Sequence, residues 1–377
     1  MKRRLGSICI GAMLLSGTVV IAKVQTHSSA PAKSKDESAV VLRFAVSGDS
    51  RNCGDVVMPG IASKVIAEQA AFYWHLGDFR AIYTFDEDMQ HEPEHVAQPL
   101  NIYTYENIAW PDFLENQIVP FGFVPVFLGI GNHETIPPKT REALIPQIAD
   151  WLDTPVLREQ RLRDDPHDHH LKTYYHWLMA HTDFINLDNA SADQFDQDQL
   201  KWFEDLLARD EASSGVTTII VGMHKALPDS ISADHSMNES PAGTESGRRV
   251  YRDLLRAQND AHKRVYILAS HSHFYMENIY NTETWRTHGG VLPGWIVGTA
   301  GAVRYAFPDD ITGAGAHFTN VYGYLLASIH ADGAIQFEFR KLDEKDVPVP
   351  VSSRFTPEFV HWCFEKNSYA TTESEAH

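Results

Sequence analysis

The chain has 377 residues, which exceeds the usual size of a single domain but suits one large domain with long insertions. It contains 50 acidic and 32 basic residues, so its formal net charge is −18. This excess argues against a surface for nucleic acid or for an anionic membrane, because both require a basic face. An anionic ligand would have to be attracted by a local positive charge such as a bound metal ion.

The N-terminus has the pattern of a secretory signal. A basic start at residues 1–4 precedes an apolar run from Leu5 to about Ala22, and small residues follow to about Ala32. Cleavage after Ala22, or less typically after Ala32, would give an exported protein, either periplasmic or secreted. The alternative is an uncleaved membrane anchor, because the run is nearly long enough to span a bilayer. We expect a signal peptide over 1–22 and a linker over 23–39.

Two cysteines follow the signal, Cys53 and Cys363. An oxidising compartment could join them in a disulfide. Two cysteines so far apart are also commonly buried free thiols. The sequence leaves both possibilities open.

Six apolar, β-rich runs occur along the chain, and each ends in a polar or glycine-rich turn. In chain order these runs are Val40–Val46, Ala71–Leu76, Val124–Ile130, Thr217–Val221, Arg264–Ala269 and Trp295–Val297. Continuous apolar runs of this length are typical of strands that are covered on both faces. Helical patterns lie between several of them, at Gly60–Phe72, Asp196–Arg209 and Val250–Gln258. Strands that alternate with helices predict a layered α/β fold, in which ligands bind at the carboxyl ends of the strands.

Two long polar and aromatic segments interrupt this pattern, from Ala81 to about Trp110 and from Thr135 to about His181. Long insertions are usually functional lids or loosely ordered surface, and these two follow directly on polar turns, which favours lids. The alternating run Ala334–Leu342 predicts a strand of a second sheet. We expect one domain over 40–366 and a disordered tail over 367–377.

The turns after the predicted strands carry side chains that bind metal ions. The candidates are Asp49, Asp78, Asn132, His224, His271 and His273. Carboxylate, amide and imidazole ligands suit divalent or trivalent first-row metals. Six candidates are too many for one tetrahedral zinc with an open position, but they suit two metals that share a bridging carboxylate. The close spacing of His271 and His273 supports two metals, because each ring could serve a different ion.

In their order, these turns resemble the motifs of calcineurin-like metallophosphoesterases and, more distantly, those of purple acid phosphatases. The motifs are Gly48-Asp49-Ser50-Arg51, Gly77-Asp78, Gly131-Asn132-His133-Glu134, a lone His224 and Ser270-His271-Ser272-His273. The resemblance runs from about Val40 to Gly301. It implies an αββα sandwich of two mixed β-sheets flanked by helices, with the metal site at the C-terminal ends of the strands.

The resemblance also implies a role for each residue. The first metal would be bound by Asp49, Asp78 and His273, Asp78 would bridge the two metals, and Asn132, His224 and His271 would complete the second site. The implied cofactors are two divalent or trivalent ions, such as Mn, Fe or Zn, and the implied reaction is hydrolysis of a phosphate ester by metal-activated water. His133 would be the general acid or transition-state stabiliser for the leaving oxygen, and Glu134 would orient the His133 imidazole.

The first motif departs from the family pattern at Arg51, where many members have a metal-binding His. Purple acid phosphatases also lack that His, but they have a Tyr at the position that Ala81 holds here. Either only one metal is tightly bound, or Arg51 and Arg80 contact the phosphate of the substrate. The alternative for each arginine is an ion pair with a neighbouring carboxylate such as Asp55 or Asp86.

Two functions fit these motifs. The first is an exported metal-dependent phosphoesterase that acts on a small-molecule or macromolecular phosphate ester. The second is a degenerate protein that keeps the fold and binds metal or phosphate without turnover. The joint presence of Asp78, Asn132 and His133 favours the enzyme, since a binding protein needs no leaving-group acid. No nucleic-acid-binding surface is evident, and membrane association would require an uncleaved N-terminus.

Overall fold

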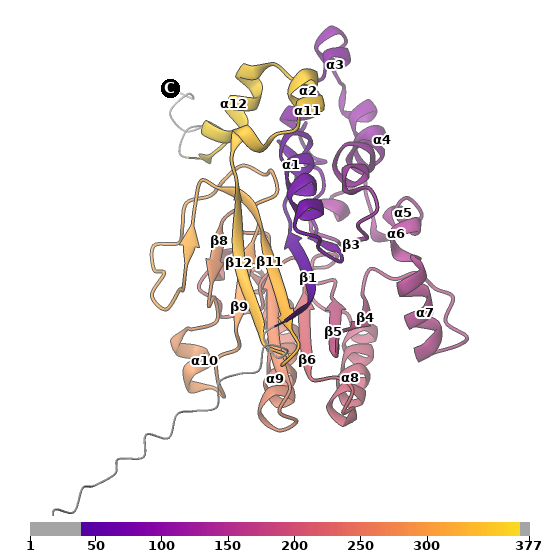
Figure 1. Ribbon diagram of the computed structural model, residues 1–377, viewed down its shortest axis with the longest axis vertical. Helices are drawn as coiled ribbons and strands as arrows, with labels where there is room; N and C mark the ends of the chain where they lie inside the picture. Colours follow the sequence, from indigo (N-terminus) through magenta and orange to yellow (C-terminus); the bar gives the residue numbers. More distant parts are fainter. Residues whose placement is uncertain (1–38, 370–377) are drawn as a thin grey trace, which may run out of the picture.

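A computed structural model describes residues 39–369 (Figure 1). In this part of the chain, two mixed β-sheets pack face to face, and helices cover their outer sides. The predicted αββα sandwich is therefore confirmed. The predicted signal peptide and the last residues of the predicted tail lie outside the described residues. No helix within residues 39–369 is long and apolar enough to cross a membrane.

The first sheet contains the strands that carry the first three motifs. Its order is β12 (Ile335–Leu342), β11 (Tyr322–His330), β1 (Val40–Ser47), β2 (Tyr73–Leu76) and β3 (Val126–Gly129). β1, β2 and β3 run parallel, and β11 and β12 complete the sheet as antiparallel neighbours. All residues of β2 and β3 are buried, as their continuous apolar runs predict.

The second sheet contains the strands that carry the last two motifs. Its order is β10 (His317–Phe318), β8 (Tyr275–Glu277), β9 (Gly294–Val297), β7 (Arg264–Ala269), β6 (Thr218–Gly222), β5 (Thr182–Asn186) and β4 (Tyr175–Met179). The central strands β9, β7, β6 and β5 are parallel, and the outer strands are antiparallel to their neighbours. The parallel strands therefore bring their carboxyl ends to one edge.

Helices lie outside both sheets. They are α1 (Gly54–Ala67), α2 (Glu87–Gln90), α3 (Pro93–Ala97), α4 (Ile102–Phe113), α5 (Arg141–Leu144), α6 (Ala149–Leu152), α7 (Pro155–Asp164), α8 (Gln197–Ala212), α9 (Pro241–Asn259), α10 (Glu283–Thr287), α11 (Val349–Arg354) and α12 (Pro357–Glu365). α1 and α4 pack on the first sheet, whereas α8 and α9 pack on the second. α9 begins nine residues before its predicted start, since Ser240 accepts a hydrogen bond from the amide of Gly243 and Pro241 occupies the first turn.

The two insertions are packed parts of the domain rather than lids. The first insertion buries Tyr105 and Trp110 against α1 and the first sheet, and the second buries Leu144 and Leu152 in the same cluster. The large aromatic and aliphatic side chains in these segments form the core that covers the outer face of this sheet. The insertions therefore add stability, and only parts of their surfaces are available to a ligand.

A disulfide joins Cys53 to Cys363, so the open alternative of two free thiols is replaced by a covalent link between α1 and α12. Figure 1 shows α11 and α12 beside the N-terminal helices, at the end of the molecule where β1 terminates. Asn367 is buried, and its side-chain amide donates to the carbonyl of Gly301 at 3.3 Å. The folded part of the chain thus extends past the predicted domain end at 366.

Candidate metal centre

The six predicted ligands converge where parallel strands end. Asp49 follows β1, Asp78 follows β2, Asn132 follows β3, His224 follows β6, and His271 and His273 follow β7. Asp49, Asp78 and His273 form one group of candidate ligands, and Asp78, His224 and His271 form a second. Within each group, the ligand atoms lie within 4.8 Å of one another. Asp78 belongs to both groups. Two stacked sheets bring such ligands together when the carboxyl ends of their parallel strands lie on the same side.

Three of these residues have a left-handed backbone conformation, which turns each side chain out of its strand. The φ angles are +61° at Asp49, +60° at Asp78 and +68° at His271. The preceding Gly77 has a φ of +99°, and a Cβ at that position would lie 2.2 Å from the backbone nitrogen of Gly131. Only glycine fits where these two backbone segments approach each other, so the close packing explains the Gly-Asp sequence of the second motif.

The second group consists of four acceptor atoms that face one another. The Nε2 atom of His224 lies 3.0 Å from Oδ1 of Asn132, 3.0 Å from Nδ1 of His271 and 3.3 Å from Oδ1 of Asp78. The other ring nitrogen of His224 donates to the carbonyl of Leu76 at 3.0 Å, so Nε2 carries a free lone pair. Lone pairs at such distances repel each other unless a cation lies between them.

Glu239 fixes the second imidazole of this group. Oε1 of Glu239 lies 3.4 Å from Nε2 of His271 and accepts a hydrogen bond from this nitrogen, which leaves Nδ1 free to bind a metal. Lys225, which follows His224, donates to Glu239 and holds the carboxylate in place. Glu239 lies on a short 3-10 helix, Met237–Glu239, within a polar loop. No local sequence pattern marks such a distant partner, and sequence reasoning missed it.

The first group contains two buried carboxylate oxygens without a hydrogen-bond donor, Oδ1 of Asp49 and Oδ2 of Asp78. Oδ1 of Asp49 lies 3.2 Å from Nε2 of His273, whose Nδ1 donates to the carbonyl of Val303 at 2.6 Å. The Nε2 atom of His273 therefore also presents a lone pair. Buried carboxylate oxygens are rarely left without a partner, so this donor set fits a cation here as well.

Burial favours the neutral imidazoles of His273 and His224. It lowers the pKa of His273 to about 4 and also lowers the pKa of His224, against the opposing effect of the aspartates. Burial tends to raise the pKa of Asp49, but the neighbouring His273 and His224 hold it below its usual value. Neutral imidazoles and ionised carboxylates are the forms that bind metals.

His133 lies at the edge of this cluster. Its Nδ1 donates to the carbonyl of Ala81 at 2.7 Å, and its Nε2 lies 3.6 Å from Oδ2 of Asp78. The ring packs against Tyr83, with 5.3 Å between ring centroids. Burial lowers the pKa of His133, whereas the Asp78 carboxylate opposes this shift. The Nε2 atom thus points toward the same space as the first group of ligands.

Glu134 has a different position from the predicted one, because Ala81 rather than Glu134 orients the His133 ring. The Glu134 carboxylate accepts three backbone hydrogen bonds, from Asp78 at 2.9 Å, Phe79 at 2.8 Å and Gly131 at 2.6 Å. Burial and the Asp78 carboxylate raise the pKa of Glu134, to about 8, against the effect of these donors. Glu134 therefore joins the second and third motif loops and supports the ligands indirectly.

The two arginines have different positions. Arg80 is fully buried and pairs with Asp55 at 2.6 Å, with Asp88 at 3.0 Å and with Asp112, so the ion-pair alternative is correct for Arg80. Arg51 instead points into the cluster.

The Arg51 guanidinium borders the first group of ligands. Its Nη2 lies 3.2 Å from Nε2 of His273, and its Nε lies 3.8 Å from Oδ2 of Asp78. Burial lowers the pKa of Arg51, but the carboxylates of Asp78 and Asp49 raise it further, so the guanidinium stays charged.

Two aromatic residues that sequence reasoning missed border the cluster. The ring of Tyr305 stacks on His273 at 3.9 Å, and its hydroxyl accepts a hydrogen bond from Arg51 at 3.4 Å. The ring of His235 lies 5.8 Å from His271 and 5.3 Å from Tyr305. Both come from loops far along the chain, so no motif spacing indicates them.

Comparison with known proteins agrees with this geometry. The family model described as calcineurin-like phosphoesterase matches residues 55–275, more than half of the chain, and the match begins after Asp49 and Arg51. No curated protein sequence matches the chain. Several solved structures share the fold.

A purple acid phosphatase from yellow lupin (Lupinus luteus) seeds has a TM-score of 0.56 at 18% identity, over 81% of this chain and 52% of the lupin chain. This chain therefore spans about half of the lupin enzyme. PhoD has a TM-score of 0.52 at 14% identity, over 82% and 72% of the two chains. A dimetal phosphatase from Danio rerio has a TM-score of 0.52 at 11% identity, over 80% and 97%.

Proposed function

The chain belongs to the calcineurin-like phosphoesterase family, and on that premise we propose that it hydrolyses a phosphate ester with the help of two metal ions. The observation that carries this proposal is the position of Asp78, which belongs to both groups of ligands, with its Oδ1 3.3 Å from Nε2 of His224 and its Oδ2 without a hydrogen-bond donor. A single carboxylate between two such groups is the bridging ligand of a two-metal site.

The residues that would hold the ions divide into two sets. The first ion would be held by Asp49, Asp78 and His273, and the second by Asp78, Asn132, His224 and His271. When bound, Mn, Fe or Zn ions in these sites would supply a water nucleophile near neutral pH and neutralise charge on the phosphoryl oxygens. The second set has four ligands, whereas the first has three ligands and the Arg51 guanidinium.

The remaining side chains define where the ester would lie. In its protonated form, His133 would keep one N–H on the carbonyl of Ala81 and direct the other, on Nε2, toward the leaving oxygen. Arg51, which also lies beside Oδ2 of Asp78, would stabilise the negative charge of the phosphoryl oxygens. The cluster thus offers a proton donor and a fixed cation in addition to the metal ligands.

The alternative function, binding of metal or phosphate without turnover, is separated from the enzyme by one assay. Purified protein loaded with Mn, Fe or Zn should hydrolyse a generic aryl phosphate. Absence of hydrolysis with all three metals, in folded protein whose metal content has been measured, would favour the binding protein.

The disulfide supports export, because such bonds persist in oxidising compartments such as the periplasm and the extracellular space. We therefore place the protein outside the cytoplasm, as its N-terminal pattern also predicts. Localisation of a tagged full-length chain by cell fractionation tests this placement.

The substitution His133→Ala is expected to lower the turnover number about 100-fold or more, the usual contribution of a positioned general acid. The metal content should not change, because the ring makes no contribution to either set of ligands in the proposed scheme. The measurement is kcat on an aryl phosphate together with metal analysis. His95→Ala serves as a control, since His95 is a histidine of α3 that pairs only with Glu94 among the described ion pairs. Full activity in the His133 variant would contradict the assigned role.

The substitution Arg51→His is expected to tighten the first metal site at least about tenfold. It removes a positive charge that borders Asp78 and His273, and it adds an imidazole that can bind the ion. Calorimetric titration of metal-free protein with Mn²⁺ should show two unequal sites in the natural protein and two similar sites in the variant.

Two further variants define the cause of this change. Arg51→Ala removes the charge without adding a ligand, so an intermediate affinity would assign part of the effect to charge alone. Arg248→Ala removes an arginine that pairs with Asp229 at 2.7 Å, outside the cluster, and should leave both affinities unchanged. Unchanged metal stoichiometry and affinity in Arg51→His would show that Arg51 does not weaken the first site.

A further inference from the structure

Three cavities lie in series, because each shares lining residues with the next. The first cavity, of about 360 Å³, shares Arg141, Glu142 and Asp196 with a middle cavity of about 190 Å³. The middle cavity shares Lys172 and Tyr174 with a third cavity of about 240 Å³ that is also lined by Trp202. We call this series the side groove. The second insertion forms one wall of the side groove, and the segment from Asp188 to α8 forms the other.

The side groove begins next to the candidate metal centre. Thr135, which lines the first cavity, donates from its backbone nitrogen and from its hydroxyl to the carbonyl of Asn132, each at 3.2 Å. Asp188, on the opposite wall, lies directly after β5 at the same sheet edge as His224. The first cavity therefore borders the loop that carries Asn132.

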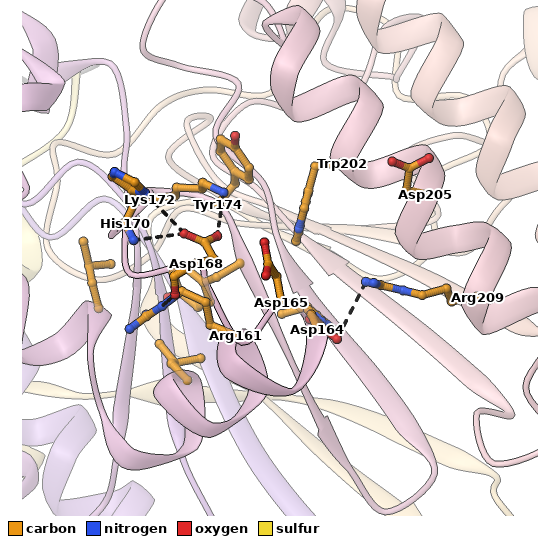
Figure 2. Close-up of a pocket in the computed structure, with 14 residues that line it drawn as sticks. Arg161, Asp164, Asp165, Asp168, His170, Lys172, Tyr174, Trp202, Asp205 and Arg209 are labelled. Atoms are coloured by element: carbon orange, nitrogen blue, oxygen red, sulfur yellow. Dashed lines mark hydrogen bonds and ion pairs between the residues drawn. The ribbon is translucent and has the colours of Figure 1, made fainter.

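The far cavity combines an aromatic wall with an apolar floor. The rings of Trp202 and Tyr174 lie 5.1 Å apart, tilted by 54°, and both are partly exposed. Figure 2 shows the two rings on one side of the cavity and Arg161 and Asp168 on the other. Leu152 and Leu157 also line it. An aromatic face beside polar groups suits a ligand that has both polarised C–H bonds and hydroxyls.

In the middle and far cavities of the side groove, the arginine and lysine side chains are paired within the protein. The pairs are Arg141 with Asp196 at 3.2 Å and with Asp188 at 3.6 Å, Lys172 with Asp168 at 2.9 Å, Arg161 with Asp153 at 2.6 Å, Arg209 with Asp164 at 3.8 Å, and Lys201 with Asp205 at 2.7 Å. An anionic ligand would have to displace the carboxylate of such a pair. A hydroxyl can instead donate to the carboxylate and accept from the cation without breaking the pair.

We propose that the side groove binds a neutral oligosaccharide and that Trp202 stacks on one of its sugar rings. The sugar hydroxyls would use the free positions of the paired carboxylates and guanidinium groups, and the ring C–H bonds would face the indole. A phosphate carried by such a chain would reach the metal centre past Thr135, which makes phosphorylated carbohydrate the substrate class; this last step rests on the proposed phosphoesterase function.

The test is calorimetric or fluorescence titration of the metal-loaded protein with neutral tetrasaccharides, namely cellotetraose, maltotetraose, chitotetraose and mannotetraose. At least one should bind saturably and shift the Trp fluorescence. The substitution Trp202→Ala should weaken that binding about tenfold, whereas Trp202→Phe, which keeps an aromatic ring, should weaken it less. Glu204→Ala, also on α8, should leave the dissociation constant unchanged, because Glu204 pairs with Arg249 outside the side groove.

Hydrolysis of a small aryl phosphate by these variants separates the two proposals. Trp202→Ala should keep this activity, because Trp202 lies outside the metal centre. Saturable tetrasaccharide binding without aryl phosphate hydrolysis would contradict the phosphoesterase function and support the carbohydrate site. The carbohydrate site would be overturned by hydrolysis without binding of any tetrasaccharide, or by equal binding to Trp202→Ala and the natural protein. Asp205→Ala, an exposed substitution in the same cavity, replaces Trp202→Ala if that variant fails to fold.

Discussion

The substitution Asp78→Asn is expected to abolish tight binding of both metal ions and to reduce kcat/KM at least about 1,000-fold. Asp78 is fully buried and belongs to both groups of ligands. Loss of its charge leaves two sites that each keep fewer anionic ligands, and two-metal catalysis requires both. Asparagine has the same shape and tolerates the left-handed conformation, so the fold should be preserved.

Metal analysis after gel filtration and kinetics on an aryl phosphate measure this effect. Asp229→Asn is a matched control, because Asp229 also has a left-handed conformation, with a φ of +60°, but pairs with Arg248 outside the cluster. Thermal unfolding of both variants checks that they fold. Retention of two ions and of natural activity by Asp78→Asn would show that Asp78 does not bridge.

The substitution Cys363→Ala is expected to lower the free energy of unfolding by about 2–5 kcal/mol, the usual effect of removing a native disulfide. The bond to Cys53 links positions that are 310 residues apart, so it restricts a large part of the unfolded chain. The bond also fixes Cys53, which precedes α1 and lies two residues after Arg51. We therefore expect the first metal site to lose more affinity than the second.

Urea denaturation of the natural and variant proteins, with and without a reducing agent, measures this contribution. The reducing agent should destabilise the natural protein to about the level of Cys363→Ala and should have no further effect on the variant. Thiol titration of the native protein provides an independent check. Two titratable thiols in the folded, non-reduced protein would contradict the disulfide.

The strands and the ligand positions could be predicted from the sequence because both depend on local patterns. The run Arg264–Ala269 coincides with β7, and the run Thr217–Val221 is displaced by one residue from β6. A strand buried on both faces is mostly apolar, and here the turns after these strands carry polar side chains. Asp49 and His273 therefore stand out in the sequence although 224 positions separate them, and the parallel topology brings them together.

Other features depend on contacts between distant segments, and local patterns do not indicate them. The buried side chains of α4 include Tyr105 and Trp110, and Pro111 lies inside the helix. Its sequence therefore resembles an irregular insertion, and its helical structure depends on packing in the core of the first sheet. Glu239 and Tyr305 acquire their positions beside His271 and His273 only through tertiary packing. The choice between substrate contact and ion pairing for Arg80 likewise depended on Asp112, a carboxylate from α4.

The left-handed backbone at Asp49, Asp78 and His271 orients candidate metal ligands but lowers the thermal stability of the protein. A side chain in this conformation costs on the order of 1–3 kcal/mol, whereas glycine adopts it freely. Selection for stability alone would favour glycine at all three positions, and each such change would delete a metal ligand. Engineering of a more heat-resistant form should therefore leave these turns intact and seek its gains in the helices that cover the outer faces of the sheets.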